Sequence, residues 1–529
     1  GAVVAAVIVI VALVAGGAAR TLEARRANQE AEKARQALAE AVQVSDFLIG
    51  LFETVDPDRG ADDPESVDEL LAKAEATMDE ELADQPLARA RFLQTIGRIA
   101  FNRADLDRAV HLYEQALALR EENQAAEHPN IIRILGSLGV IYRRQGREAE
   151  AEAVLVRAIS LYESSDQPST GPFAATLSWL ANLHYQQGQF EKAADGHRRA
   201  LELRRREVPR NPGAIGESLN NLSLALRDLA RPEEARPLVL EAEAHFTEAF
   251  GPDHPLVASS WLNRAGLEEM LGNWDGAEEL LMKAAALFSR IHDDPLHHRI
   301  LTTRRGLGSL WGRWHRFDDA AEHLAELLEE QLAAPAADRL EIARTQMILA
   351  SAERRRGRLD AAGRLARATF ATRSELLGDD HFLTQSARLE MAWVRAGRGE
   401  GRRAKLEIEE LMAERERTHG ADHSGVGHIA FALGRVHFEM GEVDEAGRAF
   451  SRALDIFGSV RDGASVEAGD CQLWLGRVRL AQNRFDEASR LLDRSRDNFR
   501  RFMPPGHPLL AEAEAEVERT RDLSSEPNT

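Results

Sequence analysis

Residues 181–193 read Ala-Asn-Leu-His-Tyr-Gln-Gln-Gly-Gln-Phe-Glu-Lys-Ala, and versions of this pattern return along most of the 529-residue chain. A small residue is followed seven positions later by a turn residue, then by an apolar residue, and twelve positions after the first by alanine. Two antiparallel helices approach to about 8–10 Å only where the facing side chains are small. Glycine between them ends the first helix in a left-handed cap. The stretch therefore predicts one helical hairpin.

The closing alanine recurs at a fixed period of 42 residues, with one extra residue near Trp311. Ten copies of the pattern occupy residues 89 to 499. A constant period of this kind is typical of stacked hairpins that each contact only their neighbours. The sequence therefore predicts an all-α solenoid of about ten helix-turn-helix repeats. The recurring residues are Ala109, Ala151, Ala193, Ala235, Ala277, Ala320, Ala362, Ala404, Ala446 and Ala488.

The layout resembles the tetratricopeptide repeat, whose usual period is about 34 residues. The additional residues fall between hairpins, where several connections carry a His-Pro or Asp-His element, a combination similar to the subclass found in kinesin light chains and many bacterial proteins. The resemblance implies a right-handed superhelical solenoid with protein or peptide partners of very different kinds. Because the histidine recurs once per unit, we expect it to satisfy backbone groups at helix ends. These histidines are His128, His254, His381, His423 and His507.

The beginning of the chain is an apolar run without a charged side chain from Ala2 to Ala19. At about 1.5 Å per residue it spans about 27 Å, close to the bilayer core of roughly 30 Å. We therefore expect residues 1–19 to form a transmembrane helix. A cleaved signal peptide is the alternative, since residues 15–19 are small. A retained anchor is favoured because the chain starts at Gly1 without a basic leader, and we expect further residues upstream.

The next segments predict covers for the open ends of the solenoid. Residues 20–56 are rich in Ala, Glu and Arg and favour a juxtamembrane helix, which serves as a cap on the first repeat, as a signalling stalk, or as both. Residues 57–88 are expected to form an N-terminal capping helix region. Residues 500–522 are expected to form a C-terminal capping helix, followed by a disordered tail at 523–529.

A second resemblance rests on the order of elements near the start. The apolar span, the helix rich in Arg and Glu, residues 44–52 (Val-Ser-Asp-Phe-Leu-Ile-Gly-Leu-Phe), Asp56-Pro57 and Glu80-Glu81-Leu82 precede the repeats. This order is similar to the C-terminal half of bacterial transmembrane serine/threonine kinases of the Pkn type. The resemblance implies a single-pass protein of the bacterial inner membrane whose catalytic domain precedes the span. The chain would then be the sensor or scaffold half of the kinase, and a stand-alone membrane-tethered scaffold is the alternative.

Two arguments give opposite topologies for the repeats. Five basic residues directly after the span place the repeats in the cytoplasm by the positive-inside rule. The kinase resemblance places the catalytic half in the cytoplasm and the repeats outside it. Both topologies stay open, and we prefer the extracytoplasmic one that the resemblance implies. The basic residues are Arg20, Arg25, Arg26, Lys33 and Arg35.

Composition and motifs exclude several functions. The formal net charge of -20 argues against a nucleic-acid partner, because phosphate neutralisation needs a basic surface. The single cysteine, Cys471, rules out an intramolecular disulfide and a Cys-rich zinc site. We find no Walker loop, zinc-protease motif, nucleophile elbow or kinase motif, so we expect no enzyme, cofactor or metal. The His cluster at His292, His297 and His298 lacks fixed ligand spacing.

The solenoid groove is the expected partner site. In tetratricopeptide arrays the first helix of each unit lines the concave face, and helical spacing assigns six positions per unit to it. Thirteen arginines and six acidic residues fall there, which leaves an excess of seven positive charges in an acidic chain. A basic groove would attract acidic peptides or carboxy termini. Alternatively, arginine is simply abundant, and cations are favoured near helix C-termini. The positions are Arg91, Arg98, Arg133, Arg143, Arg144, Arg227, Arg305, Arg313, Arg344, Arg354, Arg355, Arg435 and Arg477, with Glu217, Asp228, Glu269, Glu390, Glu439 and Asp470.

Three kinds of side chain make up the predicted peptide-binding groove. Arginines would grip carboxylates, asparagines and a tyrosine would hold the peptide backbone, and a tryptophan would serve as an anchor. Trp393 and Trp474 also fall at groove positions. The ligand's identity and the oligomeric state are not predicted. The candidate residues are Arg98, Arg143, Arg144, Trp179, Asn182, Tyr185, Asn220, Asn221, Arg227, Asn263 and Arg305.

Overall fold

The computed structural model describes residues 78, 82–165, 170–335, 337–458 and 465–525. The expected transmembrane helix, the juxtamembrane helix and most of the N-terminal capping region lie outside the described residues. Within the described residues the structure is all-α, with 21 helices, as the repeat pattern predicts. None of these described helices is long and apolar enough to cross a membrane.

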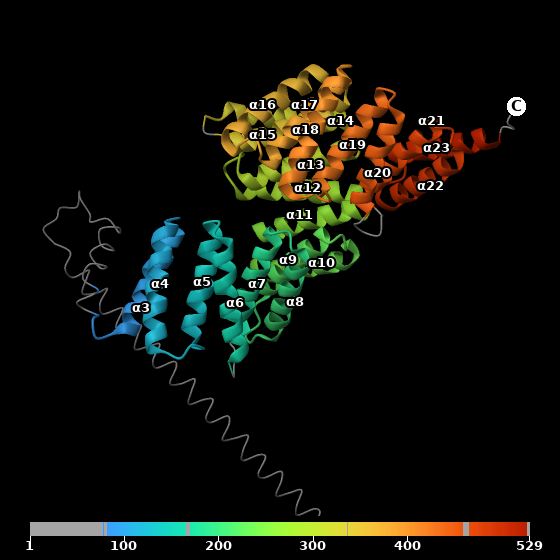
Figure 1. The fold of residues 1–529 in the computed structure, drawn as a ribbon. Helices are drawn as coiled ribbons and strands as arrows, with labels where there is room; N and C mark the ends of the chain where they lie inside the picture. Colours follow the sequence, from blue (N-terminus) through green and yellow to red (C-terminus); the bar gives the residue numbers. More distant parts are fainter. Residues whose placement is uncertain (1–77, 79–81, 166–169, 336, 459–464, 526–529) are drawn as a thin grey trace, which may run out of the picture. The chain divides into compact units, whose positions relative to one another are not determined.

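The chain divides into two compact units, Gly1–Arg210 and Asn211–Thr529. Successive helices pair as antiparallel hairpins within each unit (Figure 1). The described helices of the first unit are α3 (Pro86–Asn102), α4 (Leu106–Asn123), α5 (Pro129–Arg144), α6 (Glu148–Ser164), α7 (Thr170–Gln186) and α8 (Phe190–Arg206).

The second unit contains six hairpins (α9/α10 to α19/α20) plus α21/α22 in its described part, and it ends with α23, which packs on α22. The expected C-terminal cover, residues 500–522, falls on the end of α22 and on most of α23. The helices are α9 (Pro212–Asp228), α10 (Pro232–Phe250), α11 (Pro255–Met270), α12 (Trp274–Ile291), α13 (His298–Arg313), α14 (Phe317–Ala333), α15 (Arg339–Arg355), α16 (Leu359–Leu377), α17 (Phe382–Gly397), α18 (Gly401–His419), α19 (Ser424–Glu439), α20 (Val443–Gly458), α21 (Val466–Ala481), α22 (Phe485–Phe502) and α23 (Pro508–Ser525).

The small residue of each first helix is required by the packing within its own hairpin. In α13, a Cβ atom added to Gly308 would lie 2.6 Å from Cγ of Leu324, which packs over it from α14. Gly434 in α19 is covered by the ring of Phe450 from α20 in the same way. The recurring alanine of the second helix, such as Ala193, is fully buried. Close helix approach at small residues therefore determines the repeat, as ridge-and-groove packing requires.

The connection histidines cap the helices that follow them, which confirms their predicted structural role. The Nδ1 atom of His254 accepts a hydrogen bond from the backbone N–H of Leu256 over 3.2 Å, and His423 accepts from Gly425 over 3.0 Å. These bonds satisfy backbone donors that a helix N-terminus leaves without an intrahelical partner. His297 caps α13 through Arg299 in the same manner, over 3.4 Å.

The second unit also contains contacts between helices far apart in sequence. The indole N–H of Trp274, at the start of α12, donates to the carbonyl oxygen of Phe502 over 3.0 Å. Nε2 of His507 lies 3.0 Å from the carbonyl oxygen of Arg313. The Trp274 ring packs against the rings of Trp314 and His507. These contacts bring the turns around α12 and α13 against the α22–α23 connection, so the hairpins of the second unit surround an interior space.

Candidate functional site

The interior of the second unit holds a cavity of about 1500 Å³. Most of its wall comes from the first helices of successive hairpins, α9, α11, α13, α15, α17, α19 and α21, and from α23. The closing contacts of Trp274 and Phe502 form part of the same wall. We call this space the central cavity.

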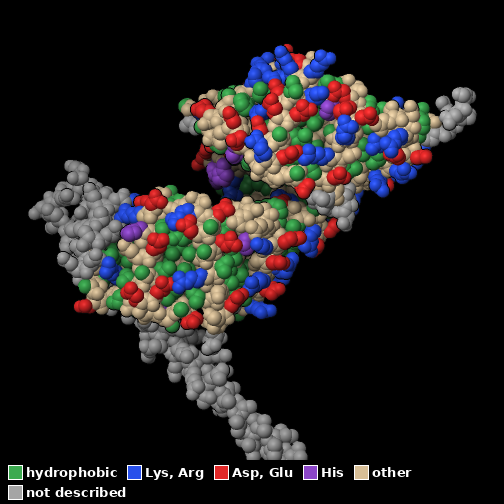
Figure 2. Space-filling view, viewed as in Figure 1, with side chains coloured by type: hydrophobic (Ala, Val, Ile, Leu, Met, Phe, Trp, Pro, Cys, Tyr) green, Lys and Arg blue, Asp and Glu red, His purple; other side chains and the backbone are tan. Residues whose placement is uncertain are grey.

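The charged lining of the central cavity is balanced. Among the described residues, seven arginines and seven carboxylates line it. The positive excess expected for the whole groove is therefore not present here. The outer surface is also mixed, with basic and acidic side chains interspersed over the face shown in Figure 2. The lining residues are Arg227, Arg313, Arg354, Arg355, Arg415, Arg435 and Arg477, with Asp228, Glu269, Glu390, Glu439, Glu467, Asp470 and Glu512.

Pairing within the protein neutralises most of these arginines. Arg354 donates from Nε to Glu390 over 2.6 Å, and Arg477 binds Glu512 over 2.6 Å. Arg435 has one longer bond, 3.3 Å to Glu439, and its buried Nε has no hydrogen-bond partner. For Arg355, no hydrogen bond or ion pair is formed with any described residue. Arg415 also has no carboxylate partner among the described residues, but it donates to the carbonyl oxygen of Phe382 over 3.3 Å. Arg355 and Arg435 are therefore the cations near the centre with capacity for a ligand.

Aromatic rings hold these guanidinium groups in place. The Arg435 guanidinium lies 3.9 Å from the centre of the Trp474 ring and 5.7 Å from that of Trp393. Arg355 lies 5.5 Å from the Phe317 ring centre. Cation–π contacts of this kind stabilise a cation without using its N–H groups as hydrogen-bond donors. The guanidinium groups are thus oriented while donors stay available.

Arg355 is exposed and Arg435 is partly exposed, but the surrounding helices still change the pKa of both guanidinium groups. Burial, with the nearby Arg354 adding to it, lowers the pKa of Arg355. Burial also lowers the pKa of Arg435. Both directions mean that the charged forms lack full compensation in the cavity, although arginine stays charged at neutral pH. An anion between the two groups would supply that compensation.

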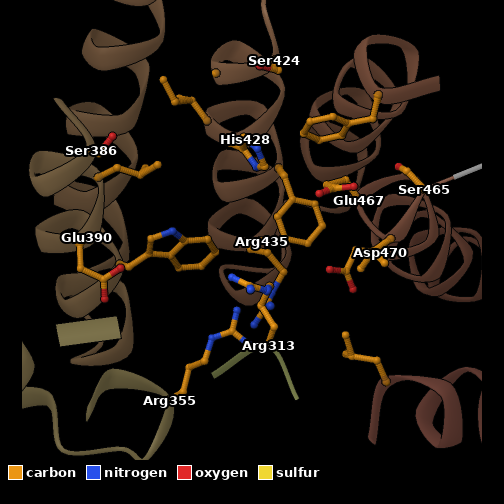
Figure 3. A pocket seen from close by; sticks show the side chains of 18 of the residues that line it. Arg313, Arg355, Ser386, Glu390, Ser424, His428, Arg435, Ser465, Glu467 and Asp470 are labelled. Carbon is orange, nitrogen blue, oxygen red and sulfur yellow. The ribbon is translucent and has the colours of Figure 1, made fainter. Parts of the chain in front are cut away.

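Two carboxylates on α21 face these arginines. Figure 3 shows Arg355 and Arg435 converging on the middle of the cavity, with Asp470 and Glu467 opposite Glu390. Burial raises the pKa of Asp470 to about 7, with Glu467 adding to the rise and Arg355 opposing it. Neither Asp470 nor Glu467 forms a hydrogen bond or ion pair with a described residue. The cavity therefore has an uncompensated group of each sign.

The sequence-predicted groove residues of the first unit contact neighbouring helices. Arg98 lines a pocket of about 420 Å³ between α3, α4 and α5. Arg143 donates to Gln186 over 3.3 Å, and Arg144 lies 4.3 Å from the Phe101 ring centre. Trp179 covers Gly136, whose added Cβ would lie 2.6 Å from the indole. Tyr185 packs edge-on against Phe190, and Asn182 is partly buried.

Of the predicted residues in the second unit, Arg227 lines the central cavity, where it is paired with Asp228 over 2.8 Å. Asn263 donates to Asn220 over 2.6 Å, and Asn221 is partly buried. Arg305 is buried and paired with Glu341 over 2.6 Å. A ligand role for these residues stays a prediction, and Arg305 is sequestered beneath the surface.

The repeat register places the central residues of the cavity in the groove, but it does not distinguish them from the other groove residues. Arg355, Arg435, Trp393, Trp474 and Asp470 all stand at predicted groove positions and all line the cavity. Ion pairs between repeats distinguish the groove arginines from one another. Arg354, for example, pairs with Glu390, which is 36 positions away. Only the folded arrangement shows which cation keeps its donors available.

Repeated two-helix units packed at small residues around an interior cavity define a helical-repeat scaffold. Models of the tetratricopeptide repeat match residues 88–164, 173–212, 214–290, 256–329, 342–383 and 429–501. The chain therefore belongs to the tetratricopeptide repeat family, and it is a protein-interaction scaffold of that family.

Curated relatives match about a third of the chain. Kinesin light chain-related protein 3 of Arabidopsis thaliana is 22% identical over 229 residues, which are 35% of this chain and 35% of that protein. The mitochondrial tetratricopeptide repeat protein 19 of Mus musculus is 30% identical over 159 residues, which are 30% of this chain and 42% of that protein. The chain thus spans well under two thirds of the length of these relatives.

Solved structures share the helical-repeat arrangement at low sequence identity. The apo form of the quorum sensor NprR from B. thuringiensis is 14% identical, with a TM-score of 0.46, and the match covers 77% of this chain and 98% of that chain. A tetratricopeptide repeat protein from Parabacteroides merdae is 18% identical, with a TM-score of 0.41, covering 56% of this chain and 98% of that chain.

Proposed function

We propose that this scaffold binds a peptide segment of a partner protein in the central cavity, with a carboxylate of the peptide held by Arg355 and Arg435. The observation that carries the proposal is the difference among the arginines of the lining. Arg354 and Arg477 already have close carboxylates, whereas Arg355 has none among the described residues. Guanidinium groups bind carboxylates by short, charge-assisted hydrogen bonds.

The size and lining of the cavity support a peptide rather than a small molecule. Its volume of about 1500 Å³ exceeds the roughly 300–1,000 Å³ typical of small-molecule sites. Trp393 and Trp474 offer large apolar surfaces to side chains. The hydroxyl groups of Ser386 and Ser424 also line the wall and can bind an extended backbone. Of the preference for acidic ligands that the sequence predicts, the proposal keeps a single peptide carboxylate, bound at Arg355 and Arg435.

The test compares the unmodified full chain with the double variant Arg355→Gln/Arg435→Gln. Peptides selected against the full chain should lose about tenfold or more in affinity, because charge-assisted hydrogen bonds are lost. The matched control is Arg364→Gln, an exposed arginine on α16 outside the cavity. Affinity measured by fluorescence anisotropy should not change in the control. Equal affinity of the double variant and the unmodified chain for every selected peptide rejects the proposed site.

We further propose that the scaffold is membrane-anchored and forms the sensor half of a bacterial serine/threonine kinase, with its repeats outside the cytoplasm. The apolar run at residues 2–19 and the pattern at residues 44–57 support this, and both lie outside the described residues. A stand-alone tethered scaffold is the second candidate. Reading the coding sequence upstream of Gly1 separates the two candidates, because a kinase catalytic core there would support the first one. Carbonate extraction of membranes tests the anchor, since removal of residues 1–19 should release the chain.

The side of the membrane is open to a labelling experiment. The single native cysteine, Cys471, is buried, so it should contribute little background. An Asp455→Cys variant places a thiol at an exposed site on α20. A membrane-impermeant maleimide should label this variant in intact cells if the repeats are extracytoplasmic. Labelling only after cell lysis would place them in the cytoplasm instead.

A further inference from the structure

The carboxylates of the central cavity differ in how they are paired. Five of the seven contact an arginine of the protein, over 2.5 to 3.3 Å. The two exceptions are Glu467 and Asp470, which form no ion pair with a described residue. They stand three positions apart on α21, so their side chains share one face of the helix. The paired carboxylates are Asp228, Glu269, Glu390, Glu439 and Glu512.

Arg415, on α18, has no carboxylate partner within the described part of the chain but donates to the carbonyl oxygen of Phe382 over 3.3 Å. The other unpaired groups of the lining fall into two poles. Arg355, with Arg435 partly compensated, forms a positive pole on α15 and α19. Glu467 and Asp470 form a negative pole on α21. Arg355 and Asp470 interact electrostatically but are not within ion-pair distance. The space between the poles is part of the central cavity, so a ligand rather than an internal bond can bridge them (Figure 3).

We infer that the central cavity selects a peptide of mixed charge, which places a carboxylate at Arg355 and Arg435 and a cationic side chain or amino terminus at Asp470 and Glu467. The inference rests on the proposed function and names the ligand's second charged group. An acid-rich run would bring like charges against Glu467 and Asp470, which costs affinity and suppresses such partners. A ligand with one charge of each sign compensates both poles and leaves the balanced lining neutral overall.

The titration behaviour of the negative pole agrees with this geometry. Burial raises the pKa of Asp470 to about 7, Glu467 and Glu512 add to the rise, and Arg355 and Arg435 oppose it. On the neighbouring helix α19, burial lowers the pKa of His428 although Glu467 opposes this shift, so this imidazole is not a competing cation at neutral pH. A bound ligand cation would favour the ionised carboxylate and lower the pKa of Asp470. Affinity for a mixed-charge peptide should therefore increase as pH rises toward about 7 and level off above it.

The experiment uses the full chain and a set of synthetic peptides that carry one Glu and one Lys at varied separation on a neutral background. Fluorescence anisotropy identifies the best-binding separation. The Lys of that peptide is then changed to Gln, and both peptides are measured against the unmodified chain and against Asp470→Asn. This double-mutant cycle isolates the coupling between the ligand cation and Asp470. Asp455→Asn, an exposed position on α20, is the matched control.

Loss of the peptide Lys should cost about tenfold against the unmodified chain and the Asp455→Asn control, and less than about twofold against Asp470→Asn. The same loss in both chains overturns the inference, as does equal affinity for peptides with two Glu residues. Either result leaves the proposed function intact if Arg355→Gln/Arg435→Gln still weakens binding. Absence of that weakening, or no binding of any peptide, overturns the proposed function and the inference together. Circular dichroism of Asp470→Asn verifies that the variant is folded.

Discussion

The indole N–H of Trp274 donates to the carbonyl oxygen of Phe502 over 3.0 Å, although the two residues are 228 positions apart. Trp274 begins α12 and Phe502 ends α22, so the bond joins the second hairpin of the second unit to its last. In a repeat array, contacts are normally limited to neighbouring repeats. This bond, with that between His507 and Arg313, encloses the central cavity.

Two substitutions of Trp274 should separate the contribution of its hydrogen bond to Phe502 from the contribution of its buried ring. Trp274→Phe removes the N–H donor and should cost about 0.5–1.5 kcal/mol of unfolding free energy, the usual worth of one hydrogen bond. Trp274→Ala should cost about 3–5 kcal/mol, because the buried ring is lost as well. Urea unfolding of the full chain measures both values.

Spin labels at Asp275→Cys and Arg501→Cys should report closure directly, because both positions are exposed and flank the bond. Double electron–electron resonance should give a narrow distribution of the distance between the two labels in the otherwise unmodified chain. The distribution should broaden toward longer distances in Trp274→Ala. The same distribution in both chains would mean that other contacts hold the ring closed.

The packing of the repeat predicts opposite outcomes for two glycines of α13. Gly308→Ala should destabilise by about 1–3 kcal/mol, because overpacking forces Leu324 from its place. The new Cβ would lie 2.6 Å from Cγ of Leu324. Gly306→Ala is the control: its Cβ would lie 3.4 Å from Leu281, an ordinary contact. That change should be neutral or stabilise by up to about 1 kcal/mol through helix propensity. Thermal melting that does not separate the two variants would contradict the packing.

These hairpins could be predicted because the sequence pattern that forms them is local. The small residue, the turn and the buried alanine fall within thirteen residues, as in 181–193. Capping by His254 could also be predicted, because the histidine recurs with the repeat. The closing bond of Trp274 could not, since no pattern with a period of 42 residues relates positions 228 apart.

The candidate site was predicted only as far as the helix face. Helical spacing assigned Arg354 and Arg355 to the groove together, although they are adjacent in sequence. Their difference comes from Glu390 on the next hairpin, which pairs with Arg354 alone. Likewise, Arg305 was assigned to the groove, but Glu341 holds it in a buried pair. Which charges remain for a ligand depends on contacts between repeats, and these require the three-dimensional structure.

The histidine caps should contribute to stability through a single acceptor atom. His254→Ala removes the acceptor for Leu256 N–H and the ring that stacks on Phe250 at 4.4 Å. The loss should be about 0.5–2 kcal/mol, the usual cost of removing a helix N-cap. His254→Asn supplies another side-chain acceptor and should recover a large part of that loss. Chemical denaturation of the three chains decides it, and equal stability of the alanine and asparagine variants would point to the ring stacking instead.

Asp470 should make the stability of the second unit depend on pH. Folding raises the pKa of this carboxyl from 3.8 to about 7, chiefly by burial, so the folded chain binds more protons than the unfolded chain between these values. The contribution of the protonated group is fully present below the lower value and is lost as pH rises through the upper one. Asp470→Asn cannot ionise and avoids that loss.

The Asn variant should therefore melt a few degrees above the unmodified chain near pH 8, and the difference should shrink toward zero near pH 4. Asp455→Asn, at an exposed position, should follow the unmodified chain at both values. Differential scanning calorimetry across this range measures the melting temperatures. A constant offset at every pH, or a lower melting temperature of Asp470→Asn near pH 8, would mean that the Asp470 carboxylate is compensated in the folded protein, by Arg355 and Arg435, before any ligand binds.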